Sequence, residues 1–532
     1  MTTRPYLPPG RERLSPPTGT RPSRPGRAAP GPEPTPTPPG GAPPVSAPRE
    51  GKARDRGEPV AAISLRARRP LPTTTPSPQT AARRAEPVRR EILTLAWPVF
   101  AENILATLTQ IVGMILVGRL GAEAIAAVGL SFQPFWLLQG LFMGLGAGTT
   151  ALVARLTGAG DPEGAVRVTQ QSLLVATAMA LLCGLVTVPF TRQIVILMGA
   201  QAGVVELGKA YLDRLLPGLL VMMIATVLGG ALRGAGDTRT PMWANVVVNV
   251  LNLVLSWALI YGRLGLPALG VAGAGLAATL ARVVGTGVLL FALLTGRTVL
   301  DLRPGRLGGA GALLRLDSAT VARLLRVGLP AAGERVVNNL GQILYTRVVA
   351  GLGTVAFAAH SLALNVESLS YMPGLAFSVA AATLVGQSLG AHRPDQAARS
   401  GWECNRMALW VMGLMGAVFF LAPAPLLRLY TADEAVISQG VVALRIVAFT
   451  QFPEAVGFVL SGALRGAGDT RSVLWITVAG VWVVRLGLSL LFVPVLGLGL
   501  VGAWLAMLLD WLVRAGYLMA RFRAGAWKEV RV

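Results

Sequence analysis

The sequence predicts an all-α membrane protein with twelve transmembrane helices in two pseudo-symmetric six-helix bundles. Three observations carry this prediction. The chain of 532 residues is 53% hydrophobic and only 14% charged, which is more apolar than a soluble domain of this size requires. Apolar runs of about 18 residues or more recur along it, each long enough to cross a bilayer as a helix. A ten-residue segment also occurs twice, at the same place in each half.

The apolar runs divide the chain into two lobes of six helices. We expect an N-terminal lobe over residues 91–295, a cytoplasmic linker over 296–323 and a C-terminal lobe over 324–525. The predicted membrane spans are, in chain order, 92–117, 124–153, 167–190, 204–231, 239–262, 269–294, 324–350, 355–387, 399–422, 436–463, 471–494 and 499–521.

Residues 1–90 differ from the rest in composition. Residues 1–88 hold 22 of the 37 prolines, so this segment cannot bury enough apolar surface to offset its ordering entropy. We predict a disordered, basic, Pro/Arg-rich cytoplasmic tail. Two interpretations stay open, namely a tail that binds a partner and sequence that lies upstream of the true translation start.

The placement of arginine predicts the orientation in the membrane. The formal net charge is +22, and residues 1–90 carry half of it. Most other arginines fall in loops on one side of the predicted helices. By the positive-inside rule both termini are cytoplasmic, which fits twelve spans of a multi-pass protein in the inner (plasma) membrane. The sequence lacks a basic module with stacking aromatics, so nucleic-acid binding is not expected. The loops on the opposite side hold few basic residues: Arg119, Arg192, Lys209, Arg263 and Arg428.

An internal repeat predicts the symmetry of the fold. GALRGAGDTR occurs at 230–239 and again at 462–471, an offset of 232 residues, and Glu102 aligns with Glu334 at the same offset. Because six helices separate the copies, both lobes have the same orientation and a pseudo-two-fold axis runs along the membrane normal. We interpret each copy as a cytoplasmic turn, in which Arg233 and Arg465 end one helix. The next helix can be capped by Asp237 or Thr238 in the first copy, and by Asp469 at the equivalent place in the second.

The folded part of the chain, about residues 91–525, resembles the multidrug and toxic compound extrusion (MATE) family. The paired ALRGAGDTR turns carry the resemblance, together with Trp97-Pro98 in the first helix, Gly328-Leu329-Pro330 in the seventh, and the VGRLG and VGQSLG segments that close the first and eighth. The resemblance implies a V-shaped pair of bundles. It also implies export of amphipathic or cationic organic compounds by antiport with H⁺ or Na⁺.

Four positions bear on ion coupling within that resemblance. Gly113 and Ser256 stand where one branch of the family has aspartates, and Asn338 stands near a helix-7 carboxylate of another branch. Glu454 fills the place of that branch's helix-10 acidic residue, eleven residues before the Arg of the repeated turn. The resemblance therefore implies a coupling site of the same kind with a different distribution of acids.

Carboxylates inside the predicted spans are the candidate ion-coupling and substrate-binding residues, because a charge in hydrocarbon usually faces a cavity or a partner. The alternative is a structural role, with Glu334 near Arg335 or Glu454 near Arg485. The polar candidates that share helix faces or spans with these carboxylates could hydrogen-bond substrate or coordinate a cation. The candidates are Glu102, Glu334, Glu454, Asn338, Gln342 and Gln110, followed by the possible cavity residues Asn245, Asn249, Asn252, Tyr345 and Glu367.

Enzymatic chemistry is not expected. The G-x-S-x-G pattern at 386–390 ends a predicted membrane helix, where the strand-to-helix turn of a nucleophile cannot form. Two cysteines and two histidines do not suggest a structural metal site. We expect no cofactor apart from the coupling cation, small organic molecules and the lipid bilayer as partners, and a monomer.

Two other functions stay open at this point. A related superfamily branch that moves lipid-linked precursors would require a strongly basic cavity, whereas the candidate cavity residues are acids and amides. A non-transporting receptor that signals through the tail is the other.

Overall fold

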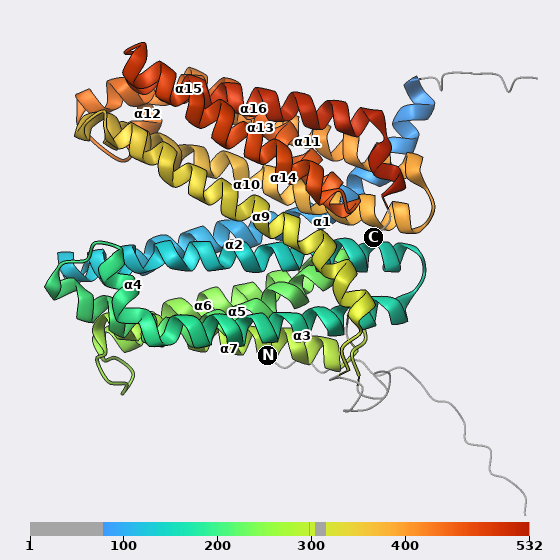
Figure 1. Cartoon of the computed structure of the whole chain (residues 1–532), viewed down its shortest axis with the longest axis horizontal. Coiled ribbons are helices and arrows are strands. Elements are labelled where there is room, and N and C mark those ends of the chain that lie inside the picture. Colours follow the sequence, from blue (N-terminus) through green and yellow to red (C-terminus); the bar gives the residue numbers. More distant parts are fainter. Residues whose placement is uncertain (1–77, 297, 304–314, 531–532) are drawn as a thin grey trace, which may run out of the picture. The chain divides into compact units, whose positions relative to one another are not determined.

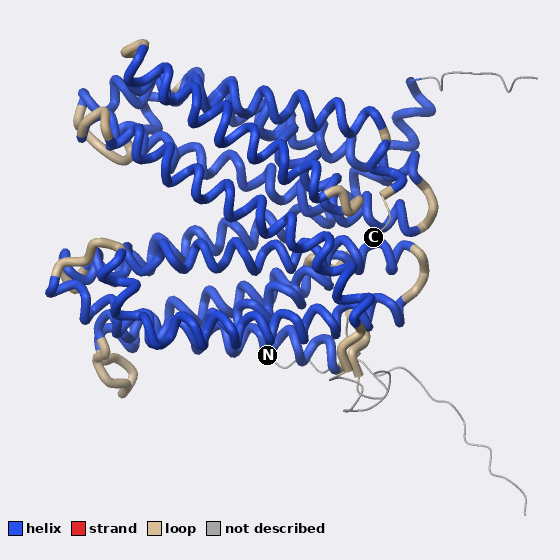
Figure 2. Tube along the Cα trace, viewed as in Figure 1, coloured by secondary structure: helices blue, strands red, loops and turns tan. Residues whose placement is uncertain are grey.

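Helices account for nearly all of the regular structure in the computed structural model of the chain (Figures 1 and 2). The structure describes residues 78–296, 298–303 and 315–530, without the side chains of 78–86 and 132–137, and no strand occurs among them. All of these residues belong to one unit, Thr75–Val532. The predicted disordered tail lies outside the described residues up to residue 77. Residues 78–90 begin the first helix, which starts earlier than the predicted span.

The predicted fold class is confirmed, with two pseudo-symmetric bundles of membrane-length helices. The first bundle holds α1 (Pro78–Gly118), α2 (Ala122–Gly158), α3 (Pro162–Thr187), the short α4 (Thr191–Leu197), α5 (Ala202–Gly234), α6 (Arg239–Tyr261) and α7 (Gly270–Leu294). The second holds α9 (Ser318–Ala350), α10 (Thr354–Gly390), α11 (Pro394–Leu421), the short α12 (Pro423–Arg428), α13 (Glu434–Gly466), α14 (Thr470–Val478), α15 (Gly487–Leu490) and α16 (Gly499–Ala524).

Ten of the described helical segments are long and apolar enough to cross a membrane by themselves. The other two predicted spans are the helices α2 and α9, which carry the contact between the bundles. The span of α14 and α15 is irregular, because Ala479–Leu486 and Leu491–Val495 are π-helical. Such wide turns are rare and often occur at functional sites.

The two bundles exchange the N-terminal parts of α1 and α9. Ile92 and Leu95 of α1 are buried in the core of the second bundle, with α10, α11 and α13. Their repeat equivalents Leu324 and Val327 of α9 are buried in the core of the first bundle, with α2, α3 and α5. This reciprocal crossing joins the bundles at one end of the molecule.

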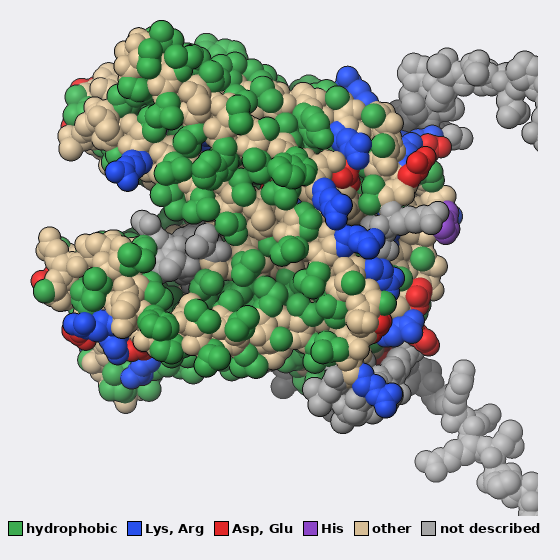
Figure 3. Space-filling view, in the orientation of Figure 1, with side chains coloured by type: hydrophobic (Ala, Val, Ile, Leu, Met, Phe, Trp, Pro, Cys, Tyr) green, Lys and Arg blue, Asp and Glu red, His purple; other side chains and the backbone are tan. Residues whose placement is uncertain are grey.

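We call that end the turn end, because it holds both repeated turns, 234–239 and 466–471, and the loops 158–162 and 390–394. The far end holds the loops 118–122, 262–270, 350–354 and 495–499. Lys and Arg side chains gather mainly at the turn end in Figure 3. The same view shows the surface hollowed between the bundles at the far end.

Candidate functional site

Two ion pairs occupy equivalent places in the two bundles. Glu102 of α1 lies beside Arg233 of α5, with 3.6 Å between Oε2 and Nη1. Glu334 of α9 accepts hydrogen bonds of 2.9 Å at both carboxylate oxygens from Nη1 of Arg465 on α13. The four side chains keep the 232-residue offset of the repeat. Each of these two carboxylates is therefore balanced by an arginine from a repeated turn.

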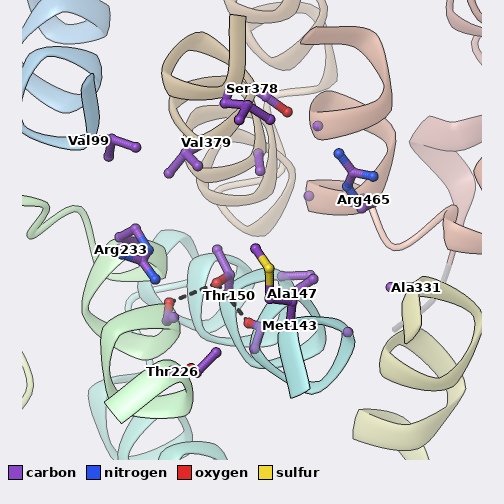
Figure 4. Close-up of a pocket in the computed structure, with 18 of the residues that line it drawn as sticks. Val99, Met143, Ala147, Thr150, Thr226, Arg233, Ala331, Ser378, Val379 and Arg465 are labelled. Carbon is purple, nitrogen blue, oxygen red and sulfur yellow. Dashed lines mark hydrogen bonds between the residues drawn. The ribbon is translucent and has the colours of Figure 1, made fainter. Parts of the chain in front are cut away.

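Both ion pairs line a cavity of about 240 Å³ between the bundles. Figure 4 shows Arg233 and Arg465 entering it from opposite sides, with Ser378 and Val379 of α10 across from α2. Much of the wall is small or apolar. The lining residues are Val99, Glu102, Asn103, Met143, Gly144, Gly146, Ala147, Thr150, Ala151, Thr226, Gly230, Arg233, Ala331, Glu334, Arg335, Leu375, Ser378, Val379, Ala382, Gly462, Arg465 and Gly466.

The charge of this cavity corrects the interpretation drawn from the sequence. The arginines of the repeated turns were assigned to the cytoplasmic surface, and the cavity residues were expected to be acids and amides. Arg233 and Arg465 instead point into the cavity, where Arg335 joins them, so three guanidiniums face two carboxylates. Sequence position alone did not reveal this, because an arginine one residue before the end of a helix can turn its long side chain toward either the surface or the bundle interior.

The repeated turns are built as the sequence predicts in their second half. Asp237 accepts hydrogen bonds from the backbone N–H groups of Arg239 and Thr240, at 3.1 and 3.0 Å. Asp469 caps α14 through Ser472 and also pairs with Arg521 at 2.9 Å. Gly236 and Gly468 adopt φ of 93° and 87°, a conformation that favours glycine.

One of the three asparagines of α6 helps to hold the first ion pair in place. Asn245 donates to Glu102 Oε1 at 2.8 Å. Asn249 donates to the carbonyl of Asn245 at 2.7 Å, and Asn252 accepts from Ser256 at 3.3 Å. Only Asn245 thus contacts a cavity-lining carboxylate. The other two make hydrogen bonds within their own helix.

The polar residues predicted on the α9 face are divided between several environments. Gln342 accepts a hydrogen bond of 3.0 Å from Arg485, and the Tyr345 hydroxyl donates to the carbonyl of Ala503 at 2.9 Å. Asn338 is half-buried, and Gln110 on α1 is exposed. None of these four lines the central cavity.

A second group of polar residues is buried inside the second bundle. Glu454 of α13 is 3% exposed and accepts a hydrogen bond of 3.3 Å from Gln451. Glu367 of α10 is 4% exposed, and its Oε1 has no hydrogen-bond partner in the described part of the chain. The helices α10 and α13, which carry the two carboxylates, pack along their length. Neither forms an ion pair with any described residue.

The ion pair expected between Glu454 and Arg485 does not form, because Arg485 has another partner. Asp510 of α16 is fully buried between two guanidiniums, 2.8 Å from Arg485 and beside Arg514 one turn away. Arg485 lies in the π-helical segment Ala479–Leu486. Asp510 was not among the residues predicted from the sequence. An acid inside the last predicted span, with Arg514 four residues later, is nevertheless a pattern that indicates an ion pair on one helix face.

Hydrogen bonds between the bundles close the turn end. Arg155 of α2 donates to the carbonyl of Ala467 at 3.0 Å, and its repeat equivalent Gln387 of α10 donates to the carbonyl of Gly234 at 2.9 Å. Each bundle thus holds the repeated turn of the other. Thr383 adds a bond of 2.9 Å to the carbonyl of Arg233.

The helices α2 and α10 cross at the turn end with almost no space between their backbones. A Cβ atom added at Gly158 would lie 1.9 Å from the carbonyl oxygen of Gln387, and one added at Gly390 would lie 1.9 Å from that of Arg155. Glycine is therefore required at both places for this closed contact. The described residues hold no group of three His, Cys, Asp or Glu that could bind a metal ion.

Two like-oriented bundles, joined at one end around a charged cavity in the membrane interior, define a multi-pass membrane transporter. The family model MatE matches residues 98–258 and 330–491, one stretch in each bundle and together more than half of the chain. The chain belongs to this family, the MATE efflux transporters, which is a family of transporters and not of enzymes.

Relatives and solved structures agree with that assignment. The chain is 33% identical over 446 residues to a probable multidrug resistance protein NorM of Thermotoga maritima, covering 83% of this chain and 94% of the relative. It is 29% identical over 442 residues to a probable NorM of Bradyrhizobium diazoefficiens, covering 81% and 92%. A multidrug resistance MATE transporter solved in an outward-facing conformation matches at a TM-score of 0.76, with 27% identity over 83% of this chain and 97% of that one.

A further solved structure is relevant to the charges in the cavity. It is a MOP superfamily transporter from Pyrococcus furiosus, for which a reverse polarity of the binding pocket suggests a different function. It matches at a TM-score of 0.76 with 27% identity, over 83% of this chain and 97% of that one.

Proposed function

We propose that this transporter exports amphipathic organic compounds, cationic ones included, by antiport with H⁺ or Na⁺. The observation that supports this most is the pseudo-symmetric cavity between the bundles, which both ion pairs line. Its apolar wall would bury the body of a substrate while a few charged groups orient it. The cavity lies within one chain, which is consistent with a working monomer.

The turn end faces the cytoplasm of the cell in this proposal, and the protein lies in the inner membrane. The arginines near that end, including Arg155, Arg393 and Arg399, support this orientation by the positive-inside rule. Both chain termini are then cytoplasmic. In this scheme the hollow at the far end faces the outside, and export requires the opposite state, in which the turn end opens.

Alternating access would proceed by rocking of one bundle against the other around the cavity. The bonds from Arg155 and Gln387 to the opposite repeated turns act as the inner gate in this scheme. They must break when the cytoplasmic side opens. Because each donor is the repeat equivalent of the other, both bonds break in one symmetric motion.

Coupling requires a carboxylate that binds the cation in one state and releases it in the other. Glu334 and Glu102 were the first candidates from the sequence, but each is neutralised by an arginine in this state. Glu454 and Glu367 are more deeply buried, and neither forms an ion pair with a described residue. A buried carboxylate without an ion-pair partner calls for a bound proton or cation to balance its charge. We therefore place the coupling cation at Glu454.

Dye accumulation in cells tests the export activity. Cells that overexpress the protein should accumulate less of a lipophilic cationic dye than cells with an empty vector. The variant Glu454→Gln keeps the shape of the side chain and removes its titration, so it should abolish the difference at equal expression. Glu334→Gln should impair efflux by leaving Arg465 unpaired, without removing the response to an imposed cation gradient. Loss of that response in Glu334→Gln with its retention in Glu454→Gln would return the coupling site to Glu334.

A second candidate function gains support from the three arginines of the cavity, namely movement of a lipid-linked precursor. Its anionic head group would need a basic site of this kind. Proteoliposomes containing the protein that translocate an anionic lipid-linked sugar, but no dye, would favour this alternative.

A further inference from the structure

One guanidinium in the central cavity has no hydrogen-bond or ion-pair partner among the described residues. Arg233 is beside Glu102 and Arg465 is bound to Glu334, but no described hydrogen bond or ion pair involves Arg335. Two charged groups act on it, namely Arg465 and Glu334, which line the same cavity. Since Glu334 already gives both oxygens to Arg465, it compensates one of the two arginines and leaves a net positive charge in the cavity.

An unpaired guanidinium inside a membrane protein is costly, and such groups usually serve a function. Arg335 is half-buried and lies one residue after a buried glutamate, on the part of α9 that packs against α2. Its repeat equivalent is Asn103, which also lines the cavity. The extra charge is therefore a departure from the pseudo-symmetry, present in the second bundle only.

We propose that Arg335 binds an oxyanion of the substrate, a carboxylate or a phosphate, so that the preferred cargo is an amphipathic compound carrying an anionic group. This inference deepens the proposed export function and rests on it in one respect, namely that the bound compound is the one transported. Guanidinium forms two parallel hydrogen bonds to such oxyanions, and the neighbouring Arg465 adds positive potential.

The size of the cavity agrees with recognition of a head group. About 240 Å³ is below the roughly 300–1,000 Å³ of pockets that enclose a drug-sized molecule. The cavity thus holds the charged end of the substrate, and the apolar remainder would lie in the hollow that opens at the far end. A cation without an anionic group would still bind through apolar contact, but more weakly.

A matched pair of dyes tests this site without any transport. The probes are a xanthene dye with a free carboxylate and its methyl ester, which differ only in the anionic group. Binding is measured by fluorescence anisotropy on the purified full-length protein in detergent. The free acid should bind more tightly than the ester. Arg335→Gln should weaken binding of the acid by about ten-fold or more and leave the affinity for the ester unchanged. Arg335→Lys should restore part of the preference.

Arg326→Gln is the matched control, because Arg326 is an exposed arginine on the same helix outside the cavity. It should leave both affinities unchanged. Equal affinity of the wild-type protein for acid and ester overturns the proposal, and so does an equal loss of both ligands in Arg335→Gln. The wild-type comparison stands even where a variant fails to fold.

Competition identifies the source of the oxyanion. Displacement of the acid dye by short-chain phosphatidate, but not by inorganic phosphate, would support a lipid head group as the natural ligand. Displacement by a small amphipathic carboxylate, but not by phosphatidate, would support a drug-like ligand. Because no gradient is applied, failure of coupled export would leave these binding results intact, which separates this proposal from the proposed function.

Discussion

The inner gate predicts that removing two hydrogen bonds shifts the protein from its outward-open to its inward-open state. The perturbation is the pair Arg155→Ala and Gln387→Ala, which removes the donors to the carbonyls of Ala467 and Gly234. Both side chains are half-buried, and neither lines the central cavity. Their loss should therefore change the conformational equilibrium more than it changes substrate contact.

The size of the shift follows from the kinds of bond. A hydrogen bond from a charged donor such as Arg155 contributes about 1.5–3 kcal/mol, and one from a neutral amide such as Gln387 about 0.5–1.5 kcal/mol. Together they contribute about 2–4.5 kcal/mol. Water replaces part of each bond at half-buried positions, so the lower figure applies. Since about 1.4 kcal/mol is a factor of ten, the inward-open population should rise by roughly 30-fold.

Spin-label distances at the far end measure this shift. The labels are attached at Glu123→Cys and Val355→Cys, which are exposed repeat equivalents at the starts of α2 and α10, after replacement of Cys183 and Cys404. The short-distance population should grow in the double variant, because the far end closes as the turn end opens.

The control is Thr279→Val, which removes a hydrogen bond of 2.5 Å to the carbonyl of Arg214 between two helices of the same bundle. It should leave the distances unchanged. The gate assignment is refuted by an identical distance distribution in wild type and double variant, or by an equal change in the control.

Three further predictions concern single positions. Gly390→Val should abolish dye efflux with retained expression, because its side chain would collide with the carbonyl of Arg155. Gly516→Val should leave dye efflux unchanged, since a Cβ atom added at Gly516 meets nothing within 4 Å. Glu367→Gln should weaken the response of dye transport to a cation gradient less than Glu454→Gln does; an equal loss in both would make the two acids a single site. The Thr320 hydroxyl holds the pKa of Asp317, at the start of α9, below its ordinary value. A carboxyl whose pKa is lower in the folded than in the unfolded state stabilises the fold at pH values above its unfolded-state pKa, and this stabilisation is lost as the pH falls through its folded-state pKa. The thermal stability of the protein should therefore fall below about pH 4. The fall should be smaller in Asp317→Asn, which lacks the titrating group.

The helices and their symmetry could be predicted from the sequence because they depend on local composition and on one repeat. A run of apolar residues of membrane length has few alternatives to a helix in lipid. The identical turns at 230–239 and 462–471 then fix the relation between the two bundles. The early start of α1 escaped prediction, since Arg83 and Arg84 resemble the basic tail in composition.

The partners of the charged residues could not be predicted in the same way. The structural alternative for Glu334 paired it with Arg335, its neighbour in the chain, but Glu334 binds Arg465, which is 131 residues away. Adjacent residues on a helix point in different directions, so sequence proximity does not make an ion pair. The crossing of α1 and α9 into the opposite bundles likewise depends on tertiary packing, which no local pattern encodes.

The irregular helix between residues 470 and 495 is a further feature that could not be predicted from the sequence. Its apolar composition predicts a simple span, yet two segments are π-helical and Arg485 lies in one of them. Pro494 removes a backbone donor from the second segment. The pairing of Arg485 with Asp510 brings α16 against the first segment.

Transport by purified protein in proteoliposomes tests the central claim, cation-driven export, most directly. Vesicles containing the wild-type protein receive an imposed pH gradient or an imposed Na⁺ gradient, and movement of a lipophilic dye is followed by fluorescence. One of the two gradients should drive the dye against its own gradient, and Glu454→Gln should abolish that movement while Arg326→Gln retains it. Dye movement that is the same with and without either gradient, or full gradient-driven transport by Glu454→Gln, would contradict the account.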